Sequence, residues 1–190
     1  MCIRDREVEA LNNILNRVSA RNLKDPHPSE DEMQSIYKAA LRAPDHAWLR
    51  PSSFIEVKGA GISRLSKIFE DYADTLEDLK EEIKEKYKMA PFRAPMIIIL
   101  VNTYKEHPKV PEIEQKLSTA AAAQNILLSL NAIGYAGIWR TGKLAFNPFV
   151  EKKLGLNRNQ SILGYLYIGT ADGPNKNIPS LKIDDFVKYL

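Results

Sequence analysis

The feature that most limits how this chain can fold is a run of six apolar residues, Met96–Val101, that follows Pro95. An uninterrupted apolar run of this length is typical of a strand buried inside a layered domain, and it is far too short to span a bilayer. With 190 residues and 44% hydrophobic content, the chain is long enough to build a core around such a strand. We therefore expect one globular domain with this strand in its interior.

Helical and strand-like segments alternate irregularly along the rest of the chain. A capping-box pair, Ser29 and Glu32, predicts a helix that ends near Leu41, before Pro44. Periodicity and charge spacing predict further helices at about Glu7–Val18, Ile62–Lys88 (one exposed helix or more) and Glu112–Ile133. Strands are predicted at Ser53–Lys58, Tyr135–Trp139 and Ile162–Ile168. The tail from Lys176 is predicted to be extended and then briefly helical at Asp184–Tyr189. This order predicts an α+β or three-layer α/β arrangement around a small sheet, and it gives little support to a doubly wound fold.

Charge and cysteine content exclude several classes of function. The net charge is +3 and bases are interspersed with acids, so a nucleic-acid groove is not expected. Cys2 is the only cysteine and the three histidines are scattered, so neither an internal disulfide nor a metal site is expected. No signal-peptide pattern or membrane-spanning run is present, which favours a cytoplasmic protein. Residues 1–6 fit no structural pattern, and we expect them to be a disordered or artefactual extension of a single domain at residues 7–190.

Two glycine-containing stretches imitate nucleotide-binding motifs. Gly59–Gly61 follows a predicted strand, but Arg64 occupies the position of the third glycine of a dinucleotide fingerprint. Gly137–Leu144 nearly matches a Walker A loop, but Leu144 stands where Ser or Thr must bind Mg²⁺. We interpret the first stretch as a plain strand-to-helix turn, and we reject nucleotide triphosphate hydrolysis for the second.

Three clusters combine arginine with hydroxyl or planar groups, a chemistry that suits a phosphate-bearing ligand. They are Arg17–Arg21 at the end of the first helix, Arg42–His46 at a proline-flanked corner, and Gly134–Gly142 around a strand end. Arg17 and Arg21 would share one face if the first helix continued. Each cluster also has an ordinary structural interpretation: a complement to the helix dipole for the first, a surface turn for the second, and a core tryptophan beside a surface charge for the third. The residues alone leave both interpretations open.

In their order along the chain, these clusters resemble the nitroreductase-like FMN flavoproteins, and within that family the short single-domain bacterial NAD(P)H nitroreductases of the YdjA type. The matching stretches are Asn16–Arg21, Leu41–His46, Ala90–Pro95, His107–Pro111, Gly137–Gly142 and Gly164–Thr170. The resemblance implies an α+β homodimer with FMN at its interface. Its fold would be a three-layer α/β/α sandwich around a small mixed, mostly antiparallel sheet, with a long central dimer helix in which the small residues of Ser118–Asn125 permit close approach.

The resemblance also implies site residues. It assigns FMN contact to Arg17, Val18, Ser19, Arg42, His46, Trp139, Arg140 and Thr141, and NAD(P) contact to Ser129, Leu130, Asn131, Ala132, Ile133 and Gly134. It names no catalytic side chain, because the flavin itself supplies the redox chemistry. Many family members carry an Asn-x-Gln-Pro-Trp element where this chain has Trp48–Ser52, which changes the polar contacts expected around the flavin ring.

The implied activity is a ping-pong transfer of hydride from NADH or NADPH, through FMN, to a small organic acceptor such as a nitroaromatic or a quinone. The implied partners are a second copy of the chain and small molecules, not nucleic acid or a membrane. Two alternatives keep the fold: a non-catalytic module that stores or senses FMN, and a different flavin reaction. We expect the charged region Ile62–Lys88 to form a mobile cover over the mouth of the flavin site.

Overall fold

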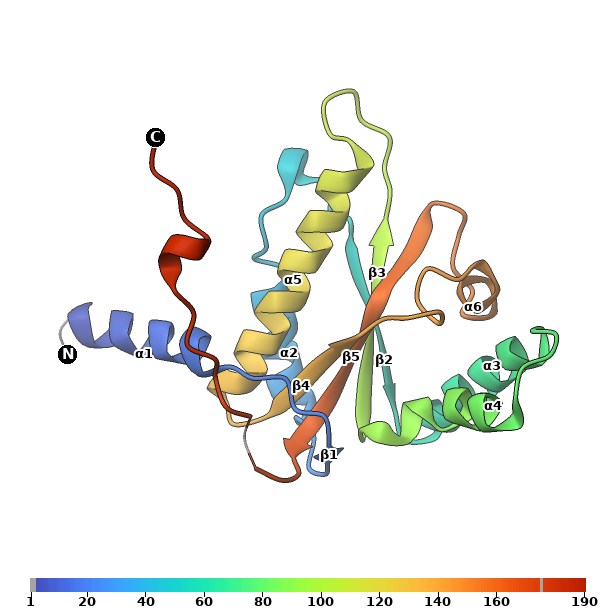
Figure 1. The fold of residues 1–190 in the computed structure, drawn as a ribbon. Helices are drawn as coiled ribbons and strands as arrows, with labels where there is room; N and C mark the ends of the chain where they lie inside the picture. Colours follow the sequence, from blue (N-terminus) through green and yellow to red (C-terminus); the bar gives the residue numbers. More distant parts are fainter. Residues whose placement is uncertain (1–2, 175) are drawn as a thin grey trace.

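The computed structural model describes residues 3–174 and 176–190 and shows a sheet between two layers of helices (Figure 1). Its strands are β1 Leu23–Lys24, β2 Ser52–Lys58, β3 Met96–Thr103, β4 Ala136–Arg140 and β5 Gln160–Ala171. The strand order is β1-β5-β3-β2, and β4 also pairs with β5. These pairs are all antiparallel, and an isolated parallel bridge joins Ser19 to Gly137. The predicted α+β fold around a small, mostly antiparallel sheet is therefore confirmed.

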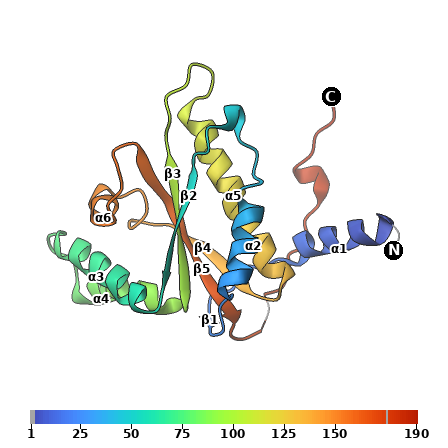
Figure 2. The same ribbon diagram turned by 180° about the vertical axis from the view of Figure 1, so that it is seen from behind.

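Helices cover both faces of this sheet (Figures 1 and 2). The α-helices are α1 Ile3–Asn16, α2 Glu30–Ala40, α3 Ala60–Asp74, α4 Glu81–Lys88, α5 Glu112–Ala132 and α6 Pro148–Lys153, and the one-turn 3₁₀ helices are η1 His46–Trp48, η2 Ala90–Arg93 and η3 Ile183–Asp185. One face packs against α2 and α5, and the other against α3 and α6. The predicted capping box is present at α2, where Ser29 Oγ accepts the Glu32 N–H at 3.3 Å and the Glu32 carboxylate accepts the Ser29 N–H at 2.8 Å.

The predicted central strand connects the two halves of the core. Residues of β3 alternate between the faces, as the two-residue period of a strand requires. Met96, Ile98 and Leu100 pack with α2 and α5, and Ile97, Ile99 and Val101 pack with α3 and α6. All six are at most 1% exposed, and burial of each is worth about 1.5–3 kcal/mol relative to exposure. The apolar run thus joins both layers to one sheet.

The helical region predicted at Ile62–Lys88 divides into two helices with different environments. The prediction of an exposed helix is right for α4, in which no residue is buried. It is wrong for α3, which buries Leu65, Phe69 and Tyr72 against the sheet. The charged residues of α3 lie on its outer side, while these apolar residues recur every three or four positions and form a core face. Only α4 is therefore free to act as the expected cover.

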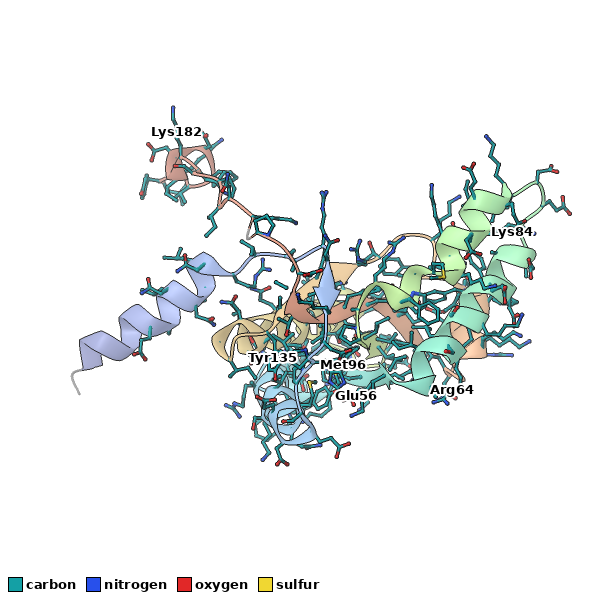
Figure 3. The ribbon with its side chains drawn as sticks, turned by 90° about the horizontal axis from the view of Figure 1, so that it is seen from below. Glu56, Arg64, Lys84, Met96, Tyr135 and Lys182 are labelled. Carbon is teal, nitrogen blue, oxygen red and sulfur yellow. The ribbon has the colours of Figure 1, made fainter. Side chains whose placement is uncertain are left out.

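The two ends of the chain project from the same side of the molecule, away from α3 and α4. Figure 3 shows Lys182 on the C-terminal tail and Lys84 on α4 at opposite extremes. Helix α1 begins at Ile3 and ends at Asn16, earlier at both ends than predicted, because the chain then turns to form the bridge at Ser19. Residues 3–6, expected to be disordered, continue this helix, and Met1 and Cys2 lie outside the described residues. In the tail, η3 replaces the short helix predicted at Asp184–Tyr189.

Candidate functional site

The segment that follows α1 lies alongside β4. Ser19 pairs with Gly137, and Arg17 Nη1 donates to Ser19 Oγ at 3.4 Å. Glycine at position 137 also lets β4 pack closely against α5, because a Cβ there would lie 2.9 Å from Leu127 Cδ2. Arg17 and Arg21 do not share a helical face, since α1 ends at Asn16. The structure nevertheless brings the first predicted cluster to the strand that carries the third.

Arg140, the last residue of β4, completes this junction. Its Nη2 donates to the carbonyl of Arg21 at 3.3 Å, and its guanidinium lies 5.4 Å from the centre of the Tyr167 ring. Its Nε is buried and has no hydrogen-bond partner. Burial, together with the positive charges of Arg93 and Arg21, lowers the pKa of Arg140. No ion pair neutralises it within the described residues, so the guanidinium is positioned to receive an anion.

The other two predicted residues of this strand end differ from each other. Trp139 is half-buried, and its Nε1 donates to the carbonyl of Leu163 at 3.2 Å. Gly164 leaves room for the indole, because a Cβ there would collide with Trp139 and with the carbonyl of Arg140. The indole therefore has a structural role in the packing of β4 on β5. Thr141 is exposed and lines a cavity.

We call this cavity the basic cavity. It has a volume of about 190 Å³ and is lined by Lys86, Tyr87, Ala90, Arg93, Arg140, Thr141, Gly142, Lys143, Leu144, Tyr165 and Tyr167. Burial raises the pKa of Tyr167 to about 12, although Arg93 and Arg140 oppose the shift. The sequence patterns did not identify Lys86, Arg93 or Lys143 as site residues. Arg93 belongs to a stretch that carried the family resemblance, Lys143 to the rejected Walker-like loop, and Lys86 to the region expected to cover the flavin site.

The corner after α2 has a constrained backbone. Ala47, Trp48 and Arg50 have φ values of +57°, +53° and +52°, a conformation that costs about 1–3 kcal/mol for each non-glycine residue. The carboxylate of Asp45 holds this shape by accepting the N–H groups of Leu49 at 3.0 Å and Arg50 at 2.8 Å. Trp48 is 78% exposed. Strain of this kind is often found where a loop contacts a ligand or partner.

His46 ties this corner to the N-terminal end of α5, because its Nδ1 lies 2.6 Å from Glu114 Oε2. Arg42 is exposed at the end of α2. Arg17 and Val18 instead lie beside Leu127 and Asn131, in the last turns of α5, a helix of 21 residues that is about 30 Å long. Figure 1 shows η1 near the N-terminal end of α5 and the end of α1 near its C-terminal end. A single chain therefore does not bring His46 to Arg17 and Ser19.

The segment Ser129–Gly134, predicted to contact NAD(P), forms the end of α5 and the turn after it. Leu130 is fully buried in the core, whereas Ile133 is 47% exposed. Asn131 Nδ2 donates to Asn13 Oδ1 at 2.7 Å and thereby joins α5 to α1. Asn131 and Ala132 line a hollow of about 860 Å³ between these helices. Part of the segment is therefore accessible, and Leu130 is not.

Among the described residues, no group of three or more His, Cys, Asp or Glu side chains could hold a metal ion. No helix in that part of the chain is long and apolar enough to cross a membrane.

Comparisons with known proteins agree along nearly the whole chain. The family model described as "Nitroreductase family" matches residues 14–170. YdjA of Escherichia coli strain K12, which carries the name of an NAD(P)H nitroreductase, is 37% identical over 186 residues, or 96% of this chain and 100% of YdjA. A protein of Haemophilus influenzae that also carries the name of an NAD(P)H nitroreductase is 30% identical over the same shares.

Solved structures show the same fold. A nitroreductase-like family protein from Bacillus cereus superposes with a TM-score of 0.82 at 25% identity, covering 95% of each chain. The FMN-dependent nitroreductase NfnB from Mycobacterium smegmatis, solved in complex with NADPH, superposes with a TM-score of 0.76 over 98% of this chain and 100% of NfnB. Its identity is 17%, so this second likeness concerns the fold alone.

Proposed function

Because this chain belongs to the nitroreductase family, we propose that it is an FMN-dependent enzyme that transfers hydride from NADH or NADPH to a small organic acceptor. Family membership makes it a nitroreductase-type oxidoreductase. The names of YdjA and of the Haemophilus influenzae protein support a nicotinamide donor, and the FMN-dependent NfnB, solved with NADPH, supports both cofactors. The acceptor in this proposal is a nitroaromatic or quinone-like compound. The oxidised nicotinamide, NAD⁺ or NADP⁺, leaves before the acceptor binds.

The observation that carries this proposal is the unneutralised guanidinium of Arg140 beside the Arg17–Arg21 segment. FMN combines a phosphate, a hydroxylated chain and a planar ring. Arg17 and Ser19 offer a guanidinium and a hydroxyl to the phosphate and the ribityl chain. Arg140 has a buried Nε without a hydrogen-bond partner, and an anionic or carbonyl oxygen of the cofactor would accept a hydrogen bond from it. The residues present therefore fit the cofactor.

In the proposed reaction, the chain positions its groups and holds charge. Bound FMN would accept a hydride from NAD(P)H and supply two electrons to the acceptor. With a nitro group as acceptor, two electrons and two protons give a nitroso group and water. Arg140 would stabilise negative charge near the flavin ring, because its guanidinium is already in place and need not move during the reaction. Trp139, fixed by its bond to Leu163, would keep this part of the backbone rigid.

We propose that the working form is a homodimer with FMN at the interface. The chain exposes large apolar side chains: Leu11, Ile14 and Leu15 on α1, Ile113 and Leu117 on α5, and Leu181, Phe186 and Tyr189 in the tail. Such surfaces are typical of interfaces, and a two-fold pair buries the same patch of both copies. The small residues of α5 mostly serve another purpose, because Ala122 and Ala123 are buried in the core of their own chain.

A dimer also accounts for the distance between the predicted site residues. His46 can share a ligand with Arg17 and Ser19 only if its corner comes from the second copy, because within one chain His46 lies at the N-terminal end of α5 and Arg17 beside its last turns. In this arrangement the constrained corner would contact the flavin ring of its partner. We extend the proposal to the accessible part of Ser129–Gly134 as a nicotinamide contact, to residues 7–190 as one FMN-binding domain, and to the cytoplasm as its compartment.

A non-catalytic FMN-binding module is the second candidate, and one experiment separates the two. The purified protein is titrated with FMN, and its visible spectrum is recorded before and after anaerobic addition of NADH or NADPH. The enzyme would lose its flavin colour and regain it when nitrobenzene or benzoquinone is added. A protein that binds FMN but keeps its colour would be a storage or sensing module. A protein that takes up no FMN would contradict both candidates.

A further inference from the structure

The basic cavity has an unusual charge composition. Four cationic side chains line it, those of Lys86, Arg93, Arg140 and Lys143, and its lining contains no acidic residue. They come from α4, η2, the end of β4 and the loop that follows, so four separate segments deliver one positive charge each. Like charges gathered without counter-charges repel one another. A cavity of this composition is suited to an anionic ligand.

The neighbouring lysines show that this charge is not a general property of the surface. On α4, Lys84 pairs with Asp74 at 3.3 Å and Lys88 pairs with Glu70 at 2.9 Å. Lys86, between them, lines the cavity and has no acidic partner among the described residues. On the same helix, therefore, two lysines are neutralised by α3 and the third is left for the cavity.

The size and walls of the cavity indicate what kind of anion would enter. Its volume of about 190 Å³ is below the roughly 300–1,000 Å³ of sites that enclose a drug-sized ligand. Tyr87, Tyr165 and Tyr167 form part of its wall, and aromatic side chains pack well against a planar ring. A compound with one aromatic ring and one negative group matches these features.

The FMN phosphate is a less suitable occupant. FMN carries one phosphate, and the proposed function places it at Arg17 and Ser19, which do not line the basic cavity. Arg140 reaches both regions, because its Nη2 bonds to the Arg21 carbonyl while its side chain lines the cavity. The cavity therefore adjoins the proposed cofactor site at Arg140 and Thr141, and it offers three further cations to a second molecule.

We propose that the basic cavity binds the electron acceptor and selects acceptors that carry an anionic group, such as a nitrobenzoate, over neutral compounds of the same shape. This inference rests on the proposed function, since the acceptor must lie beside the cofactor. Lys86 and Lys143 are its specificity-determining residues, and Arg93 and Arg140 complete the anion site.

The test compares 4-nitrobenzoate with 4-nitrobenzamide, its neutral analogue. For each acceptor, kcat/KM is measured with the FMN-loaded protein. The value for 4-nitrobenzoate is divided by the value for 4-nitrobenzamide, and this ratio is compared between variants, so that the different reactivity of the two compounds cancels. We expect Lys86→Gln and Lys143→Gln each to lower the ratio about two- to fivefold, the range for a partly exposed charge contact, mainly through KM. Lys84→Gln is the matched control, because this ammonium pairs with Asp74, and it should leave the ratio unchanged.

A second readout does not require turnover. Calorimetric titration of the oxidised protein with benzoate and with benzamide should show that benzoate binds more tightly, and that Lys86→Gln and Lys143→Gln weaken benzoate alone. FMN affinity, measured by flavin fluorescence, should stay the same in both variants. An unchanged acceptor ratio would overturn the proposal, as would a loss of FMN affinity, which would assign the cavity to the cofactor phosphate. A change only in the preference for NADPH over NADH would also overturn it, because the cavity would then bind the donor.

The two proposals fail separately. Absence of FMN uptake by the unmodified protein contradicts the proposed function, and it is measured before any variant is made. Benzoate titration of the same protein still reports on the anion site, and tight binding that Lys86→Gln weakens would support that site without the cofactor.

Discussion

Ser19 and Gly137 form an isolated parallel bridge, and through it the segment after α1 runs beside the strand that ends in Arg140. The bridge joins residues 118 positions apart in the chain. Two of the three arginine clusters are thereby united, on a strand that packs closely against α5 because residue 137 is a glycine. The second cluster, Arg42–His46, stays apart, since His46 contacts Glu114 at the start of α5, and this separation is the reason for placing the flavin between two copies.

Gly137→Ala tests the packing of β4 at the position of the bridge. The added Cβ would lie 2.9 Å from Leu127 Cδ2 and 3.3 Å from the carbonyl oxygen of Tyr167, so we expect a loss of about 1–3 kcal/mol in the free energy of unfolding, together with weaker FMN binding. Gly61→Ala is the control, because its Cβ would meet Val57 at an ordinary 3.4 Å at the start of α3. That change should be neutral or slightly stabilising. Urea unfolding of both variants measures the difference, and equal losses would contradict the account.

Arg140→Gln separates ligand binding from stability. Loss of a charge-assisted contact should weaken FMN binding by about tenfold to a hundredfold. The free protein should be no less stable, because burial and the neighbouring arginines disfavour the charge and lower the pKa of Arg140. Fluorescence titration with FMN and thermal unfolding without it give the two values. Arg64→Gln, on the outer part of α3, should change neither, and unaltered FMN affinity in Arg140→Gln would remove Arg140 from the site.

Asp45 should hold the shape of the corner. Its side chain is 10% exposed, and Asp45→Ala would leave the N–H groups of Leu49 and Arg50 without their acceptor. We expect a cost of about 1–3 kcal/mol and faster hydrogen exchange at these two amides. Asp45→Asn retains one side-chain oxygen and should lose less. If both variants exchange as slowly as the natural protein, the carboxylate does not maintain the strained backbone.

Glu32 makes stability depend on pH in a defined direction. Hydrogen bonds from the backbone and side chain of Ser29 lower its pKa below 4.5. A carboxylate whose pKa is lower in the folded than in the unfolded state stabilises the fold fully at any pH above its unfolded pKa. This contribution is lost as the pH falls through the folded pKa. Glu32→Gln should therefore lower Tm at pH 7, and the difference from the natural protein should shrink below about pH 4.5. Asp31→Asn, in the same helical turn, should not show this pH dependence.

The parts of the fold that could be predicted are those governed by local chemistry. Ser29 and Glu32 interact within one turn, and Met96–Val101 is buried because it is apolar on both faces. The burial of α3 was missed because its charges, dense along the sequence, all occupy one side of the helix, while Phe69 meets Tyr165 from a distant strand. The family resemblance identified the arginine clusters, but no local pattern indicates that Lys86 and Arg93 meet Arg140. That meeting depends on how α4 and η2 pack against the end of β4.

The central claim is that each FMN is held by the Arg17–Ser19 segment and Arg140 of one copy and by the corner of the other, and a mixed dimer tests it most directly. One chain carries Ser19→Ala with Arg140→Gln, the other carries Arg42→Gln with His46→Ala, and the two are co-expressed with different affinity tags and purified as a heterodimer. Each homodimer should bind FMN poorly. The heterodimer should bind one FMN per dimer with the affinity of the natural protein, because one of its two sites receives both unaltered halves. If the heterodimer binds no more FMN than the homodimers do, or if no dimer forms, each site lies within a single chain and the account is contradicted.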